Sequence, residues 1–434
     1  MALTRRQLIA GAGGAAAAHT LLPAVGRVGE AFGKAPVNPR AARRNRLVVL
    51  HLVGGNDGLN TFVPRSGKKA DVYRKVRPTL AIPASKTLRM DRFGDAEHHL
   101  GLNPLLRSLY RLYLRGRVAV VQGVDYPGHV YSHFDAIDNW HAGTPGRGRG
   151  AGWIGRHLDR VGVRPGELRA VGIGNELPLL LRGERRSGSQ VHSIAATRFA
   201  DGTAGIADAR HDALALFQNH AANEPLRRVA GRGGREAADL VDLFSRVRAT
   251  KSTGVPLADR MLTARSLLSL DLGVETVYLS AGAYDTHTHQ KADHILRLKD
   301  LDAAIEAFFF GTVRGAPTGQ GALPGGLDSR TILMITTEFG RRVGENGSGA
   351  QAGTDHGAAT PVILIGPSGR GATGTELVPG FHGDHPPMGS TRAPADNLAQ
   401  TMDMRRVFQS VLDDWFNDPD PIYRPYGRVP GLFR

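Results

Sequence analysis

The sequence predicts an α/β protein built on a mostly parallel sheet, and three features of the chain lead to this prediction. Short β-branched runs alternate with longer stretches in which apolar residues recur at helical spacing. Alternating strands and helices need crossover connections, which pair the strands in parallel. Polar clusters adjoin several of the strand-like runs, as expected where ligands bind at the carboxyl edge of such a sheet.

Each predicted element follows from its own local pattern. Compact apolar runs bounded by turn residues indicate buried strands over residues 47–53, 118–122, 277–281, 331–337 and 360–365. Longer stretches with helical patterns indicate helices over residues 102–113, 205–222, 234–250, 256–272, 292–310 and 397–416. No repeat of fixed period is present, so we expect a single domain over residues 45–415, followed by an extended proline-rich tail over residues 416–434.

The first 40 residues have the pattern of an export signal and its flank. Arg5 and Arg6 precede a charge-free, alanine-rich apolar run, which is typical of the twin-arginine route. We therefore expect the twin-arginine translocase as a transient partner and a periplasmic or secreted mature protein. No later stretch of about 20 apolar residues predicts an integral membrane span.

Composition and charge exclude some classes of function. The chain has no cysteine, so disulfides contribute nothing to its stability. The formal net charge is +15, but almost half of it lies in the first 47 residues, where eight basic residues stand against Glu30. The remaining basic residues lack the interleaved aromatic residues that support binding of single-stranded nucleic acid, so no nucleic-acid partner is expected.

The segment after the strand at 277–281 holds three potential metal ligands, Asp285, His287 and His289. Imidazole nitrogens and carboxylate oxygens are the ligands that zinc-type ions take, and a turn leaving a strand can direct alternate side chains to one point. The alternative is a polar loop with incidental histidines.

Similar chemistry adjoins three other strands. Asp57 follows the first strand, Glu338 follows the strand at 331–337, and His356 precedes the strand at 360–365. Acidic and imidazole groups gathered at one edge of a parallel sheet predict a metal centre there.

Ser132 follows the strand at 118–122 and begins a helix that extends to His141. Serine is a good N-cap residue, and Asp135 three positions later completes an acidic variant of the capping box. Near a metal ion, the same hydroxyl could act as a nucleophile on phosphorus or sulfur. Ser132 is therefore either a helix cap alone or a cap and a nucleophile, whereas His129, His133 and His141 are not assigned as ligands.

The motifs Gly-Gly-Asn-Asp-Gly-Leu-Asn at 54–60, Tyr-Asp-Thr-His at 284–287, Thr-Glu-Phe-Gly-Arg at 337–341 and Thr-Asp-His-Gly at 354–357 are similar to those of an exported bacterial family known as "domain of unknown function 1501". The order Asp57, Ser132, Asp285-x-x-x-His289, Glu338 and His356 also resembles the alkaline phosphatase and sulfatase superfamily. That resemblance implies an alkaline-phosphatase-like, doubly wound sheet with helices on both faces.

The resemblance also implies one or two divalent metal ions. Asp57 and Glu338 would hold one ion beside Ser132, and Asp285, His289 and His356 would hold the other. Phe339 stands where the superfamily has a histidine, so the first site has only carboxylates. Carboxylates favour magnesium, manganese or calcium, whereas the imidazoles of the second site suit zinc or manganese.

Two functions remain open on the sequence. The first is an exported metal-dependent hydrolase of phosphate or sulfate esters on an anionic small molecule, carbohydrate or envelope polymer, with Arg341 or Asn56 stabilising the developing charge. The second is a non-catalytic binding or assembly protein that keeps the fold and one structural metal, an alternative that Phe339 supports.

Overall fold

The computed structural model describes residues 44–94, 99–146, 150–162, 168–191, 252–269, 273–319, 321–368, 374–388 and 396–434. The expected export signal over residues 1–40 and the expected helices at 205–222 and 234–250 lie outside these residues. Within the described residues, no helix combines the length and apolar character needed to cross a membrane.

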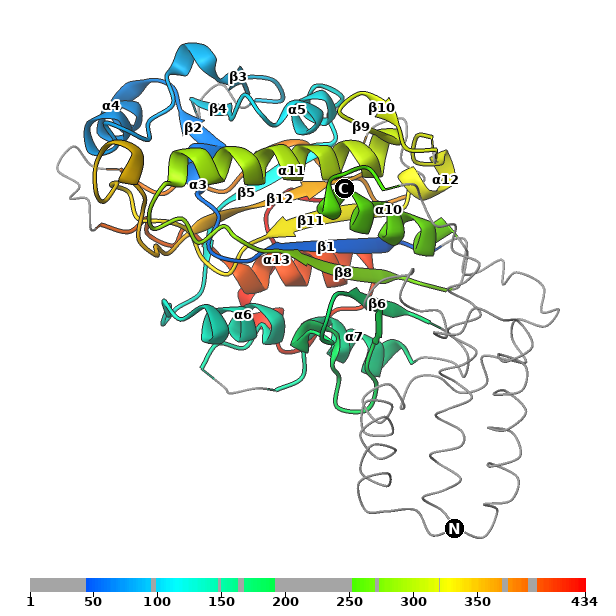
Figure 1. Ribbon diagram of the computed structural model, residues 1–434. Coiled ribbons are helices and arrows are strands. Elements are labelled where there is room, and N and C mark those ends of the chain that lie inside the picture. Colours follow the sequence, from blue (N-terminus) through cyan, green and yellow to red (C-terminus); the bar gives the residue numbers. More distant parts are fainter. Residues whose placement is uncertain are drawn as a thin grey trace, which may run out of the picture.

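A nine-stranded sheet forms the centre of the molecule (Figure 1), with eight strands in the order β13-β5-β12-β11-β1-β8-β6-β7 and β14 paired beside β5. Most neighbouring strands pair in parallel, as predicted. The strands are β1 Arg46–Leu52, β5 Val118–Asp125, β6 Ala170–Ile173, β7 Ser189–Val191, β8 Thr276–Ala281, β11 Thr331–Thr336, β12 Thr360–Ile365, β13 Gly380–His382 and β14 Met402–Asp403.

One strand runs against the others, and this reversal matters for the site. β12 pairs antiparallel with both β11 and β5. Its first residue therefore lies at the edge where β1, β5, β8 and β11 end. A residue that precedes β12 can thus meet residues that follow the other four strands.

Helices cover both faces of the sheet, which confirms the predicted fold class (Figure 1). In β1, Val48 and Leu50 join the apolar cluster that contains residues of α5 Arg107–Leu114, α10 Pro256–Ser269 and α11 Gln290–Phe310. Leu47 and Val49 join the opposite cluster with residues of α6 His133–Ala142, α7 Trp153–Val161 and α13 Met404–Ser410. Alternate residues of a strand face opposite sides, so a strand buried on both faces is apolar throughout.

Smaller elements flank the central sheet. A three-stranded sheet in the order β2-β4-β3 comprises Phe62–Pro64, Leu100–Leu102 and Leu88–Arg89, and β9 Thr312–Val313 pairs with β10 Ala316–Pro317. Further helices within the described residues are α3 Gly58–Thr61, α4 Gly67–Val76, α12 Gly325–Asp328 and the short turns η1 Ala84–Lys86, η3 Leu179–Leu181, η4 Gly349–Gln351 and η7 Arg424–Tyr426.

The C-terminal part differs from its prediction. The helix expected over residues 397–416 begins only at Met404 and continues from α13 into a π-helical turn, η6 Val411–Trp415. The segment expected to be an extended surface tail places Tyr423, Val429 and Leu432 in the apolar cluster beneath the sheet. These buried side chains make residues 416–434 part of the main core.

Candidate functional site

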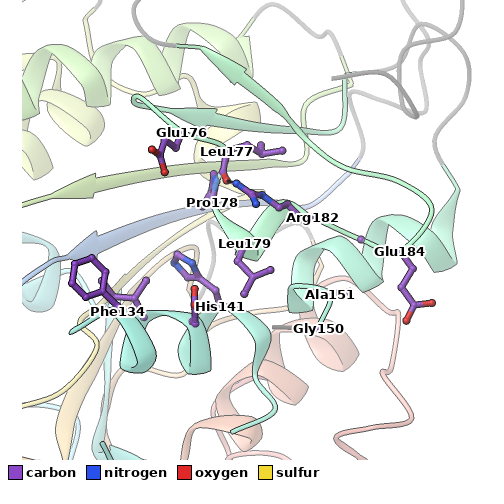
Figure 2. Close-up of a pocket in the computed structure, with 13 residues that line it drawn as sticks. Phe134, His141, Gly150, Ala151, Glu176, Leu177, Pro178, Leu179, Arg182 and Glu184 are labelled. Atoms are coloured by element: carbon purple, nitrogen blue, oxygen red, sulfur yellow. Dashed lines mark hydrogen bonds between the residues drawn. The ribbon is translucent and has the colours of Figure 1, made fainter. Parts of the chain in front are cut away.

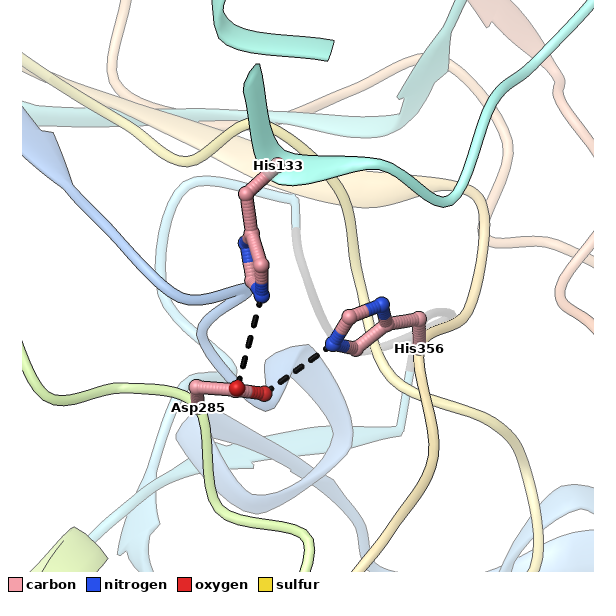
Figure 3. A group of neighbouring side chains, drawn as sticks. All are labelled: His133, Asp285 and His356. Atoms are coloured by element: carbon pink, nitrogen blue, oxygen red, sulfur yellow. Dashed lines mark hydrogen bonds and ion pairs between the residues drawn. The ribbon is translucent and has the colours of Figure 1, made fainter. Parts of the chain in front are cut away.

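Three side chains from distant parts of the chain meet at the carboxyl edge of the sheet (Figure 3). Asp285 follows β8, His133 opens α6 beyond the end of β5, and His356 precedes β12. One imidazole nitrogen or carboxylate oxygen from each lies within 4.8 Å of the others. His356 Nε2 is 3.0 Å from Asp285 Oδ1, and His133 Nε2 is 3.4 Å from Asp285 Oδ2. These residues form a candidate His/Asp site of the kind that holds a divalent ion.

A buried arginine fixes the carboxylate at the centre of this site. Arg341 Nη2 donates to Asp285 Oδ1 at 2.7 Å, and its Nε donates to the Gly55 carbonyl at 2.7 Å. It also donates to the carbonyls of Tyr284 and Thr354. Burial opposes the charge of Asp285, but the hydrogen bond and the positive charge of Arg341 outweigh it and lower the pKa of Asp285 to about 2.

Glu338 holds His133 from the other side. Its buried carboxylate accepts hydrogen bonds from the Gly54 amide and from His133 Nδ1, both at 2.7 Å, and lies 3.4 Å from His51 Nε2. The hydrogen bond to Glu338 raises the pKa of His133. Burial opposes the charge of Glu338, but these histidines hold its pKa below the usual value. Glu338 therefore orients the His133 imidazole by binding Nδ1, while Nε2 of the same ring faces Asp285.

Phe339, which replaces an expected histidine, packs against two imidazoles. Its ring centroid lies 4.9 Å from that of His133 and 4.5 Å from that of His356. Gly55, whose φ is +77°, leaves room for this ring, because a Cβ there would lie 2.6 Å from a Phe339 ring carbon. The rings of His133 and His356 also contact each other, with centroids 4.4 Å apart, so the three rings pack as one group.

Asp57 lies apart from the cluster, although the resemblance implied a metal ligand here. Its Oδ1 caps α3 by accepting hydrogen bonds from the amides of Leu59 and Asn60. Its Oδ2 pairs with Arg77 Nη1 at 2.6 Å and also accepts from Gln290. Burial raises the pKa of Asp57, but the Arg77 charge and the hydrogen bonds outweigh it and lower the pKa. Both oxygens thus have donors in the protein itself.

His289 also lies apart from the cluster, and His287 takes its place. In an extended segment, residues two apart project to the same side, and His287 Nε2 lies 3.1 Å from Asp285 Oδ1. The chain then turns, because His289 has a left-handed φ of 52° and precedes the first turn of α11. His289 is exposed, and its Nδ1 lies 3.2 Å from Thr288 Oγ1.

The three residues predicted to act in catalysis have different environments. Asn56 is buried, and its side-chain amide is hydrogen-bonded to Thr61 Oγ1 and His294 Nε2. The guanidinium of Arg341 is engaged by the carbonyls and the Asp285 carboxylate described above. Ser132 is exposed, and its Oγ caps α6 by accepting from the Asp135 amide at 3.5 Å. The predicted cap is confirmed, and the nucleophilic role of Ser132 stays a prediction.

A cavity of about 720 Å³ runs beside α6 (Figure 2). Phe134, Ile137 and His141 line it from the helix, and the segment from Leu177 to Glu184 forms part of the opposite wall. Residues three, four and seven positions apart share one face of a helix, so these three form a continuous stripe. The helix whose first residue is His133 therefore contributes both to the cluster and to a cavity large enough for a small organic molecule.

These features define an α/β protein with a candidate His/Asp site at the carboxyl edge of a mostly parallel sheet. The chain belongs to the family described as protein of unknown function (DUF1501), whose model matches residues 120–402. The match includes His133, Asp285 and His356, and it confirms the family predicted from the motifs.

Among solved structures, the chain matches the PsFucS1 sulfatase from Pseudoalteromonas sp. with a probability of 0.99, a TM-score of 0.35 and 10% sequence identity. The match covers 90% of this chain and 74% of the sulfatase chain. A likeness of this size carries no argument about activity. No curated protein matches the chain in sequence.

Proposed function

We propose that this protein is a metal-dependent hydrolase of phosphate or sulfate esters, exported by the twin-arginine route and acting in the periplasm or outside the cell. The convergence of two imidazoles on the Asp285 carboxylate carries the proposal, because such donors bind a divalent ion and ester hydrolysis gains from one. The Arg5-Arg6 pair before an apolar run supports the export route.

The chain offers a nucleophile beside this cluster. Ser132 directly precedes His133, and its hydroxyl lies at the amino end of α6, where the helix dipole favours negative charge. A bound ion would polarise the ester and favour the deprotonated hydroxyl. Ser132 Oγ would attack the phosphorus or sulfur and displace the alcohol, and water would then hydrolyse the serine ester, releasing phosphate or sulfate and restoring the hydroxyl. The cavity beside α6 would hold the organic part of the ester.

A specific observation favours the second candidate, a non-catalytic binding protein. Arg341 and Asn56, the residues predicted to stabilise developing charge, use their side chains in hydrogen bonds within the protein. A transition state would therefore depend on the ion and the helix for charge stabilisation.

Turnover of an aryl phosphate and an aryl sulfate by the purified, metal-replete protein tests the proposal. Asp285→Ala should lower turnover at least 100-fold, because the residue at the centre of the cluster is lost. Asp71→Asn, an exposed carboxylate on α4, is the matched control and should keep wild-type turnover. If the metal-replete wild type hydrolyses neither ester class, the binding-protein candidate replaces the hydrolase.

A further inference from the structure

A fourth side chain converges on the cluster. His287 Nε2 lies 2.9 Å from His356 Nε2 and 3.1 Å from Asp285 Oδ1. With His133, the cluster contains three imidazoles and one carboxylate: His287 Nε2, His356 Nε2 and Asp285 Oδ1 lie 2.9 to 3.1 Å apart, and His133 Nε2 lies 3.4 Å from Asp285 Oδ2. Ligands about 2.0 to 2.1 Å from a tetrahedral ion lie about 3.3 Å apart, so the separations among His287, His356 and Asp285 are close to those around a single ion, and His133 lies at a similar distance from the same carboxylate.

In each of the three imidazoles, Nδ1 faces a hydrogen-bond acceptor outside the cluster. His133 Nδ1 is 2.7 Å from Glu338 Oε1, and His356 Nδ1 is 2.8 Å from the Tyr131 carbonyl. His287 Nδ1 is 3.1 Å from Asp355 Oδ1. A carbonyl or carboxylate oxygen can only accept a hydrogen bond, so each Nδ1 carries a proton.

A neutral imidazole with a proton on Nδ1 has its lone pair on Nε2. The lone pairs of His287 and His356 then face each other and the Asp285 carboxylate, and the lone pair of His133 faces the same carboxylate, which also offers only lone pairs. Acceptors this close repel unless a cation lies among them, and metal-binding histidines commonly donate their other nitrogen to a carboxylate or carbonyl in this way.

We infer that His133, His287, His356 and Asp285 together form a site for one divalent ion of the zinc class. The inference rests on the metal centre of the proposed function and adds a fourth ligand and the kind of ion. Three imidazoles suit zinc, copper, nickel or iron, whereas magnesium and calcium prefer oxygen ligands. The side chains of Asp285 and His287 are 44% and 41% exposed, so an ion can enter from solvent.

Metal titration of the full chain, stripped of metal, tests this inference by calorimetry and, for cobalt, by visible absorption. We expect tight binding of one equivalent of zinc or cobalt and at least 100-fold weaker binding of magnesium and calcium. His287→Ala should weaken zinc binding at least 10-fold and change the cobalt spectrum. His289→Ala, an exposed histidine two residues away, is the matched control and should leave both unchanged.

A second variant removes one of the Nδ1 acceptors and leaves all four proposed metal ligands in place. Asp355 is exposed and acts as a positioning residue, so Asp355→Ala should fold normally and weaken zinc binding about 10-fold. The inference is overturned if zinc binds equally well to wild type and to both variants, if magnesium or calcium binds as tightly as zinc, or if no divalent ion binds. In the last case, extra protons on the histidines bridge the cluster.

These results are independent of catalysis. Tight zinc binding that depends on His287, without hydrolysis of any ester, supports the four-ligand site and overturns the hydrolase. Ester hydrolysis with zinc affinity unchanged in His287→Ala supports the hydrolase and overturns the four-ligand site.

Discussion

At the scale of single residues, Ser132 occupies a position that suits both a helix cap and a nucleophile. Ser132→Asp separates the two roles, because aspartate keeps a side-chain oxygen at the N-cap but has no hydroxyl to regenerate. We expect the free energy of unfolding to stay within about 1 kcal/mol of wild type. Turnover of aryl phosphate or sulfate should fall by orders of magnitude.

Metal content must be measured on the same Ser132→Asp sample, since a new carboxylate beside His133 can alter ion binding. Undiminished turnover in a folded, metal-replete variant would remove Ser132 from the mechanism and indicate water as the nucleophile.

Arg341 connects several segments of the chain that form the cluster. Its buried guanidinium joins the loop after β1 to Asp285 and to the Thr354 carbonyl. Lysine cannot reproduce this planar set of donors, so Arg341→Lys should lower the free energy of unfolding by about 2 kcal/mol and weaken metal binding. Urea denaturation measures the first effect. The conservative change Arg74→Lys on the exposed face of α4 should have no effect, and equal stabilities of the two variants would contradict the role of Arg341.

At the scale of secondary-structure elements, a half-buried carboxylate joins two helices. Asp302 of α11 accepts hydrogen bonds from the amide and hydroxyl of Ser108 and from the amide of Leu109, at the amino end of α5. Burial raises the pKa of Asp302 from its ordinary value of 3.8 to about 6, because it outweighs these hydrogen bonds.

This shift gives the α5–α11 contact a pH dependence with a definite sign. Between pH 4 and pH 6 the folded protein keeps the proton on Asp302 that the unfolded chain has lost, so stability falls as pH rises. The loss should be about 3 kcal/mol and complete above pH 6. Asp302→Asn keeps an acceptor oxygen but cannot titrate, and the difference in unfolding free energy between variant and wild type should change over this range. A constant difference from pH 4 to pH 7 would contradict the shift.

At the scale of the whole molecule, the last 19 residues complete the core beneath the sheet. Tyr423 is fully buried, and its hydroxyl contacts Arg156 and the Ala142 carbonyl near the end of α6. Tyr423→Ala should lower the free energy of unfolding by about 3 kcal/mol or more, as for other large buried aromatic residues. Thermal and urea unfolding measure the change. Ile422→Ala, at a neighbouring residue that is 39% exposed, should cost less than about 1 kcal/mol, and similar losses in both variants would contradict the buried role of Tyr423.

The sequence by itself determined the five adjacent strands β5, β12, β11, β1 and β8, because their pattern does not depend on distant contacts, whereas β6, β7, β13 and β14 were not predicted. β1, β8, β11 and β12 lie within one residue of the predicted ends, since each is a short apolar run buried on both faces. The direction of β12 could not be predicted from the sequence, because pairing direction depends on how the chain returns to the sheet. The buried tail was also missed, since Tyr423 has no periodic neighbours and its burial comes from contacts with α6 and α7.

The sequence determined at which edge of the sheet the candidate site lies, and it identified two residues of the site, Asp285 and His356. Only the tertiary structure decided the rest. His133 joins because β5 ends at the same edge, and His356 reaches the others because β12 runs backwards. The left-handed turn at His289 directs that histidine away and leaves His287 beside Asp285. Asp57 has the right chemistry, but Arg77 and Gln290 engage its carboxylate. Residue type and spacing identify possible ligands, whereas backbone direction and competing partners select among them.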